Sequence, residues 1–244
     1  MALAYIDKSA LDAIVNDLSS PAKAIAETVI HNHGMTNWMH RDRSPEIRTI
    51  AMQCEQHGLF EDAGKIYEKQ GNLPDAIKAY DTGKMYHRAG LLSITEGQSA
   101  QAEEFARKLE TEKPEEALDL YKKLCDSDGI KRMAPVVELK DPYEAARGYL
   151  SIGFKPEATR CADTLESMEK KDPTNMELKK KVAYIRMHVG DHESAAEIYR
   201  KVGIDNLADS LMRTSTQTTA YSPGVVIRGV PFMNYKIRDQ NDNY

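Results

Sequence analysis

Small side chains that recur every thirteen residues limit most strongly what this chain can fold into. In the stretch GLFEDAGKIYEKQGNLPDAIKAYDTG, Gly58 is followed by Ala63 and Tyr67, and the same three residue types return thirteen residues later. The same interval separates Ala145 from Ala158. Repetition at a fixed period is the sequence signature of a repeat architecture.

The period has a direct physical reading as a series of short helices. Residues four apart share one face of a helix, so the alanine lets a neighbouring helix approach and the tyrosine fills the space beside it. A helix of about nine or ten residues and a tight turn with glycine use up one period. Such helices are marginal alone in water, so they must stack. The residues expected to pack between them are Ala63, Tyr67, Ala76, Tyr80, Ala102, Ala145, Tyr149, Ala158, Ala195 and Tyr199.

Helix-start signals agree with this interpretation. Asp141 precedes a proline and stands three residues before Glu144, which is a helix-capping pattern. Thr174 and Glu177 have the same spacing and predict a second cap. The stretch APVVEL, residues 134–139, is strand-like in composition, but its proline favours a linker or the start of a helix.

The segment DPTNMELKKKVAYIRMHVGDHESAAEIYRKV, residues 172–202, resembles a tetratricopeptide repeat. The family's proline, mid-repeat glycine, small residue and aromatic residue fall on Pro173, Gly190, Ala195 and Tyr199. Lys179 stands at the family's tryptophan position, and pairs of earlier units step by only 26 to 28 residues. The shorter step is similar to that of the short-helix solenoids of vesicle-coat, intraflagellar-transport and attachment proteins.

The resemblance covers about residues 44–212 and implies an all-α fold, a TPR-like α-solenoid of stacked antiparallel short helices. It implies an adaptor or scaffold subunit that binds a peptide or partner protein along its surface, rather than an enzyme. We predict N-terminal capping helices at residues 1–43, a TPR-like domain at 44–213 and an extended C-terminal segment at 214–244.

The C-terminal segment lacks a helical period and is rich in residues that favour extended structure. Two interpretations stay open: it covers the last helix of its own solenoid, or it docks on a partner as a strand. The residues proposed to contact a partner are Tyr221, Val225, Ile227, Phe232 and Tyr235. Self-association also stays open, because an uncovered last helix could pair with its own copy.

Composition narrows the class of partner. The formal net charge of -5 and the sequence pI of about 5.9 argue against a general nucleic-acid binder.

No stretch reads as a membrane span, and the N-terminus does not read as a secretory signal. Three widely spaced cysteines predict no disulfide framework, which favours the cytoplasm.

Two alternative functions have weaker support in the sequence. His31, His33 and His40 suggest a metal-dependent enzyme, but their spacing does not match a zinc site and no cofactor is predicted. The lysine run at residues 179–181 suggests RNA binding, but acidic residues interrupt it and no aromatic residue alternates with it. Trp38, which lies between His33 and His40, is expected to be buried. Binding of another protein remains the preferred prediction.

Overall fold

The computed structural model describes residues 8–32 and 44–219, which form fourteen α-helices and no strand. The helices are α1 (Lys8–Asn16), α2 (Ser20–Asn32), α3 (Ser44–Gln56), α4 (Phe60–Lys69), α5 (Leu73–Thr82), α6 (Tyr86–Thr95), α7 (Ser99–Leu109), α8 (Pro114–Leu124), α9 (Ser127–Glu138), α10 (Pro142–Ser151), α11 (Lys155–Glu169), α12 (Met176–Val189), α13 (His192–Lys201) and α14 (Asp205–Thr219). Each helix packs against the next along the chain. The predicted all-α solenoid of short helices is therefore confirmed.

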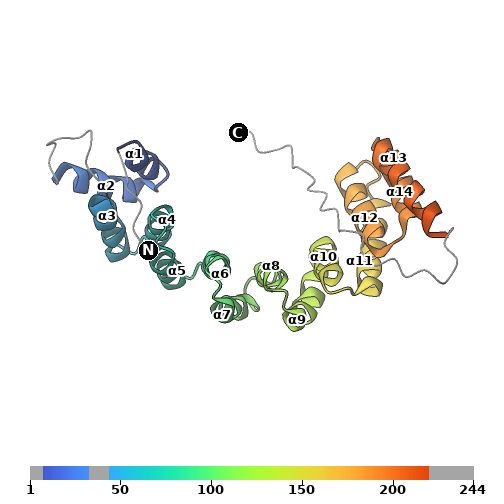
Figure 1. Ribbon diagram of the computed structural model, residues 1–244, viewed down its shortest axis with the longest axis horizontal. Coiled ribbons are helices and arrows are strands. Elements are labelled where there is room, and N and C mark those ends of the chain that lie inside the picture. The colour runs from blue at the N-terminus through green and yellow to red at the C-terminus, as the bar shows by residue number, and fades with distance from the viewer. Residues whose placement is uncertain (1–7, 33–43, 220–244) are drawn as a thin grey trace.

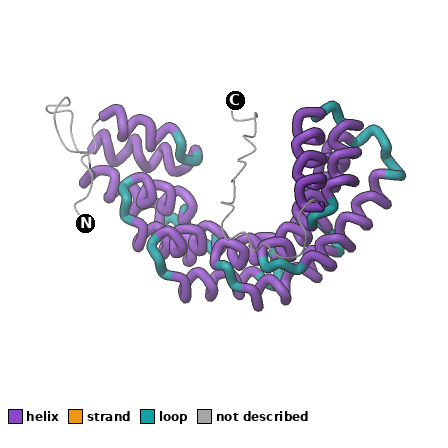
Figure 2. Tube along the Cα trace, turned by 45° about the vertical axis from the view of Figure 1, so that its right-hand side comes forward, coloured by secondary structure: helices purple, strands orange, loops and turns teal. Residues whose placement is uncertain are grey.

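The helices form a curved array with two rows. Beyond the contacts between consecutive helices, α6 packs against α8, α8 against α10 and α10 against α12. In Figure 1, α6, α8 and α10 lie on the concave side of the arc, while α7 and α9 lie on the convex side. Figure 2 shows the same curvature from another direction. We call α6, α8, α10 and α12 the inner row.

Nearly identical turns produce the regular step. Helices α4 to α7 begin at Phe60, Leu73, Tyr86 and Ser99, thirteen residues apart. After α4, Gly71 has a φ of 69°, and the N–H of Asn72 reaches back to the carbonyl of Tyr67 at 2.9 Å. Glycine adopts this left-handed conformation at the least cost, although in the equivalent turn after α5 it is Lys84, with a φ of 59°, that adopts it.

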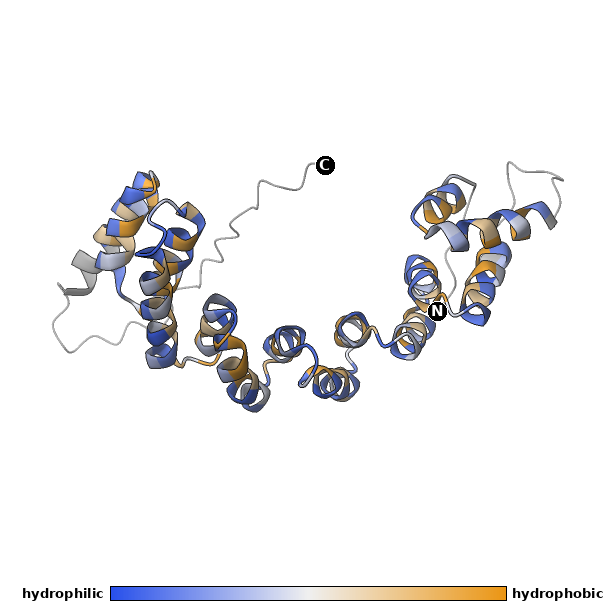
Figure 3. Ribbon diagram, turned by 180° about the vertical axis from the view of Figure 1, so that it is seen from behind, coloured by the Kyte–Doolittle hydropathy of each residue, from blue (hydrophilic) through white to orange (hydrophobic). Residues whose placement is uncertain are grey.

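Alanines and glycines let the helices approach closely. Ala63, Ala89, Ala117 and Ala145 lie in α4, α6, α8 and α10, and each has no exposed surface. A methyl group at Gly64 of α4 would overlap the ring of Tyr80 in α5. Figure 3 shows that hydrophobic and hydrophilic residues are mixed along the helices of the array.

Three local features differ from the sequence-based expectations. Asn175, not Thr174, caps α12, because its side-chain oxygen accepts from the N–H of Leu178 at 3.0 Å while the threonine hydroxyl donates to Asp172. Pro135 lies inside α9 rather than in a linker or at a helix start; both it and Lys131, whose carbonyl it cannot bond, are exposed residues.

The third difference concerns the C-terminal boundary. Helix α14 continues to Thr219, so the first six residues of the segment expected to be extended are helical. The remainder, residues 220–244, lies outside the described residues, as do residues 1–7 and 33–43. Among the helices described, none combines the length and apolar character that crossing a membrane requires.

Candidate partner-binding surface

The residues that carry the repeat pattern lie in the core and not on a binding surface. Each of the ten alanines and tyrosines named from the sequence is at most 5% exposed. Tyr121, which the pattern did not single out, is fully buried in the same way. These side chains hold the inner row in place, and the exposed side chains of that row remain available for contact.

A depression of about 390 Å³ lies on the inner row. Three helices that are far apart in sequence, α8, α10 and α12, contribute to it. It is lined by Asp119, Lys122, Lys123, Arg147, Leu150, Ser151, Tyr184 and His188. The depression depends on the packing of alternate helices into one row, so it is a product of the fold.

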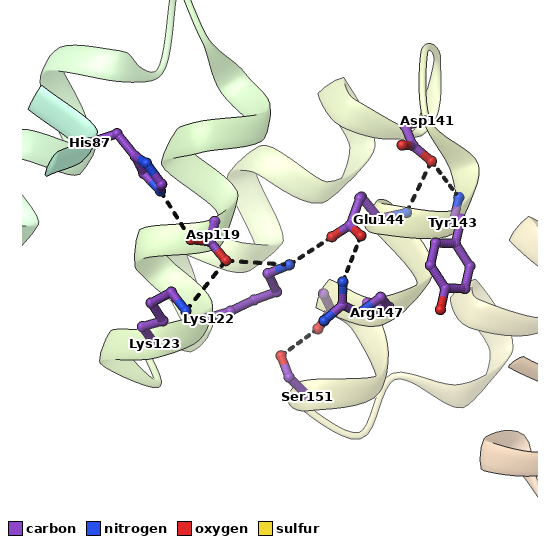
Figure 4. Close-up of polar contacts among 10 residues, drawn as sticks. His87, Asp119, Lys122, Lys123, Asp141, Tyr143, Glu144, Arg147 and Ser151 are labelled. Carbon is purple, nitrogen blue, oxygen red and sulfur yellow. Dashed lines mark hydrogen bonds and ion pairs between the residues drawn. The ribbon is translucent and has the colours of Figure 1, made fainter. Parts of the chain in front are cut away.

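A chain of polar contacts joins α6, α8 and α10 beside the depression (Figure 4). Nε2 of His87 lies 3.0 Å from Oδ2 of Asp119, and since a carboxylate only accepts, His87 donates. This hydrogen bond lowers the pKa of Asp119. Nζ of Lys122 donates to Glu144 at 2.8 Å, and Nη1 of Arg147 donates to Glu144 at 2.6 Å.

Opposing effects set the charge of Glu144. Partial burial would raise the pKa of its carboxyl group, but the hydrogen bonds from Lys122 and Arg147 outweigh burial, and the pKa lies below its usual value. Glu144 is therefore ionised at neutral pH. It holds two cations of neighbouring helices at one point of the surface.

Aromatic rings form one wall of the depression. The rings of Tyr143 and Tyr184 meet edge to face with centroids 5.9 Å apart, and the ring of His188 lies 4.1 Å from that of Tyr184. Nδ1 of His188 lies 2.8 Å from the carbonyl oxygen of Tyr184 and donates to it, because a carbonyl oxygen only accepts. These contacts hold the rings of Tyr184 and His188, both on α12, against Tyr143 of α10.

A second depression, of about 350 Å³, lies between the turn after α1 and helices α4 and α6. It also holds three cations, but each has a close partner. Lys65 lies 2.9 Å from Glu61, Lys69 lies 2.7 Å from Asp17, and Arg88 contacts a tyrosine hydroxyl at 3.3 Å. Three carboxylates offset these three cations, because Asp17 and Glu68 line the depression and Glu61 pairs with Lys65.

The residues behind the alternative functions have ordinary environments where they are described. His31 is exposed at the end of α2, while His33, Trp38 and His40 lie outside the described residues. Within residues 8–32 and 44–219, no three His, Cys, Asp or Glu side chains gather as metal ligands. In the lysine run, Lys179 lies 3.6 Å from Glu169 and Lys180 lies 2.8 Å from Glu177.

The buried cysteines are not activated nucleophiles. Burial raises the pKa of the Cys54 thiol to about 11 and that of Cys161 to about 12. Thiolates are the reactive form of cysteine, so both side chains are inert at neutral pH. Cys54 therefore behaves as a packing residue, as its fully buried position also indicates.

The sequence-based reasoning did not identify the depression, and its five candidate contact residues lie in residues 220–244, outside the described part. The spacing between repeat pairs nevertheless indicates which helices share a row. Ala117 and Ala145 are one pair apart, which predicts that Lys122 and Arg147 lie on alternate helices of the same row.

Comparisons with known proteins found similar solved structures but no family. The chain matches no family profile and no curated protein sequence. Among solved structures, it is similar to a proposed kinesin light chain from Podosopora anserina with nearly identical TPR-like repeats, at 12% identity and a TM-score of 0.27, over 86% of this chain and 90% of that one. It is also similar to BtubC from P. vanneervenii, at 13% identity and a TM-score of 0.25, over 91% of this chain and 97% of that one.

Proposed function

We propose that this chain is a protein-binding adaptor or scaffold subunit that holds a partner segment along its inner row. The observation that carries the proposal is the depression that α8, α10 and α12 build together on the concave side. An extended concave surface of stacked helices suits a long, narrow ligand such as a peptide or a helix.

The distribution of charge supports a protein rather than a nucleic acid as the partner. Carboxylates stand among the cations of the inner row, for example Asp119 beside Lys122 and Lys123. A phosphate backbone would meet these negative charges at every step along the groove. We also place the chain in the cytoplasm, because its three cysteines are free and a reducing compartment keeps thiols in that form.

Cross-linking of captured partners tests this function directly. The full chain is immobilised and incubated with a cell lysate, and captured proteins are joined to it by a lysine-reactive cross-linker and identified by mass spectrometry. We expect a reproducible partner whose cross-links concentrate on lysines of the inner row, Lys123 in α8 and Lys181 in α12. The internal control is Lys78 of α5 and Lys131 of α9, helices that lie on the convex side of the arc in Figure 1.

Two results would contradict the proposal. The first is that no protein is enriched over the immobilisation tag alone. The second is that the cross-links of enriched proteins concentrate on Lys78 and Lys131. All four lysines lie in described helices, so a difference between them reports the face that is used.

A further inference from the structure

The inner depression contains more positive charge than its own carboxylates neutralise. Three cations, Lys122, Lys123 and Arg147, share the two carboxylates of Asp119 and Glu144. Glu144 is divided between two of the cations, at 2.8 Å and 2.6 Å. Among the described residues, the only carboxylate within ion-pair reach of Lys123 is that of Asp119, at 3.9 Å.

Hydrogen-bond donors remain available at this point. Arg147 uses Nη1 on Glu144, and its Nε and Nη2 have no hydrogen-bond acceptor among the described residues. The side chains of Arg147 and Lys123 are 46% and 47% exposed, so both reach solvent. A guanidinium group presents its N–H groups in one plane, which matches the two oxygens of a carboxylate.

Apolar surface adjoins these donors. Leu150 and the ring of Tyr184 belong to the same depression as Arg147. The contacts of Tyr184 with Tyr143 and His188 hold its ring in a fixed orientation. A ligand that places a carboxylate at Arg147 can therefore rest a neighbouring apolar side chain on Tyr184 without first ordering that ring.

We propose that this depression binds an acidic segment of a partner protein. One aspartate or glutamate carboxylate of the segment pairs with Lys123 and Arg147, and an adjacent apolar side chain packs on Tyr184. The excess of one positive charge matches a single carboxylate. A phosphate dianion would carry twice that charge into a depression that already holds Asp119 and Glu144. This inference rests on the proposed function and names the partner chemistry of the same surface.

A synthetic peptide tests the proposal without knowledge of the natural partner. The probe is a fluorescein-labelled peptide of alternating glutamate and leucine, titrated with the full chain and followed by fluorescence anisotropy. We expect saturable binding that weakens from about 0.1 M to about 1 M salt, because the Debye length falls from about 10 Å to about 3 Å. The same peptide with glutamine in place of glutamate should not bind.

Substitutions separate recognition from folding. Arg147→Gln should weaken binding of the probe about tenfold, the effect of losing one charge-assisted hydrogen bond. Lys123→Gln should weaken it as well, whereas Lys65→Gln, in the second depression, should leave it unchanged. Circular dichroism and thermal unfolding show whether each variant is folded.

Glu144→Gln gives the sharpest readout, because it should tighten binding. The substitution keeps an acceptor oxygen but removes the charge that competes with the ligand for Lys122 and Arg147. If Glu144 served only to hold the helices together, the same variant would bind the probe more weakly or equally. A several-fold gain in affinity supports the proposal, and a loss or no change contradicts it.

Three further results would overturn the inference: no saturable binding of the probe, equal effects of Lys65→Gln and Arg147→Gln, or tighter binding of a phosphoserine peptide or a short RNA. Each of these results would reject the acidic ligand without rejecting the adaptor function, and the two failures can be told apart. If a partner captured from lysate cross-links to the inner row but its capture is insensitive to Arg147→Gln, the adaptor function stands and the acidic ligand does not.

Discussion

Nζ of Lys122 lies 2.8 Å from Oε2 of Glu144, and this ion pair joins α8 to α10 across the inner row. The side chain of Lys122 is only 14% exposed, so the pair is better shielded from solvent than most pairs on this chain. It connects two helices of the inner row, and the same carboxylate lies beside the candidate binding site. A change to this pair is therefore expected to affect both the stability of the array and the candidate binding surface.

The first prediction concerns this pair. Lys122→Met should lower the free energy of unfolding by about 1 kcal/mol, the upper range for a partly exposed ion pair. The matched control is Lys180→Met, which removes an exposed pair with Glu177 within α12 and should cost less than about 0.5 kcal/mol. Urea unfolding measures both values. If the two variants lose the same free energy of unfolding, the Lys122–Glu144 pair stabilises the chain no more than an exposed pair within one helix.

The second prediction concerns close approach between helices. Gly64→Ala should destabilise the chain by about 1–2 kcal/mol, because overpacking against the Tyr80 ring costs more than the helix propensity of alanine returns. Gly148→Ala is the matched change in mid-α10. Its nearest neighbour is the flexible end of Leu118 at 3.1 Å, so we expect little or no loss. Urea unfolding that ranks the two variants in the opposite order would contradict this packing.

The third prediction concerns thiol chemistry. At pH 8 and without denaturant, iodoacetamide should label Cys125, which is exposed, and leave Cys54 and Cys161 unmodified. Burial raises the pKa of both buried thiols well above 8, so little thiolate is present. Mass spectrometry of the digested protein reads out each site, and denatured protein provides the control with all three labelled. Rapid labelling of Cys54 in the folded chain would show that α3 opens.

The fourth prediction concerns alkaline stability. Burial raises the pKa of Tyr67, Tyr121, Tyr149 and Tyr199 to about 12, above the value of about 10 expected in an unfolded chain. The folded state thus favours the neutral phenols. This stability is complete below pH 10 and is lost as pH rises towards 12. Phenolate absorbance and circular dichroism should change together in that interval, and tyrosines that ionise near pH 10 in folded protein would contradict the assignment.

The fifth prediction concerns the C-terminal segment. Truncation after Thr219, the end of α14, should leave the helical content of the chain unchanged, as circular dichroism can measure. If the segment is the partner-docking element, the truncated chain should lose partner capture. If capture persists, Tyr221, Val225, Ile227, Phe232 and Tyr235 are not required for it. Light scattering of both forms reports whether the segment affects self-association.

Much of the fold was predictable because its cause is local. The thirteen-residue spacing of Ala63 and Ala76 reflects one helix and one turn, and both are short-range features of the chain. The exceptions are also local. Asn175 competes with Thr174 for the same cap, and Pro135 is tolerated inside α9 because it lies on the surface.

The candidate site was not predictable to the same degree because it depends on which alternate helices pack into one row and which side chains they expose there. Lys123, Arg147 and His188 come from three helices, and only the packing of α8, α10 and α12 into one row brings them to one depression. The period shows that alternate helices share a row. It does not show which row faces inward, because that depends on how the sizes of all the packed side chains add up along the array.

Hydrogen exchange of the chain with and without a captured partner tests the account most directly. Backbone amides of an interface exchange more slowly in the complex than in the free chain. The account predicts slower exchange in α8, α10 and α12 when the partner binds, with little change in the outer helices α7 and α9. Protection confined to α7 and α9, with none in the inner row, would contradict it.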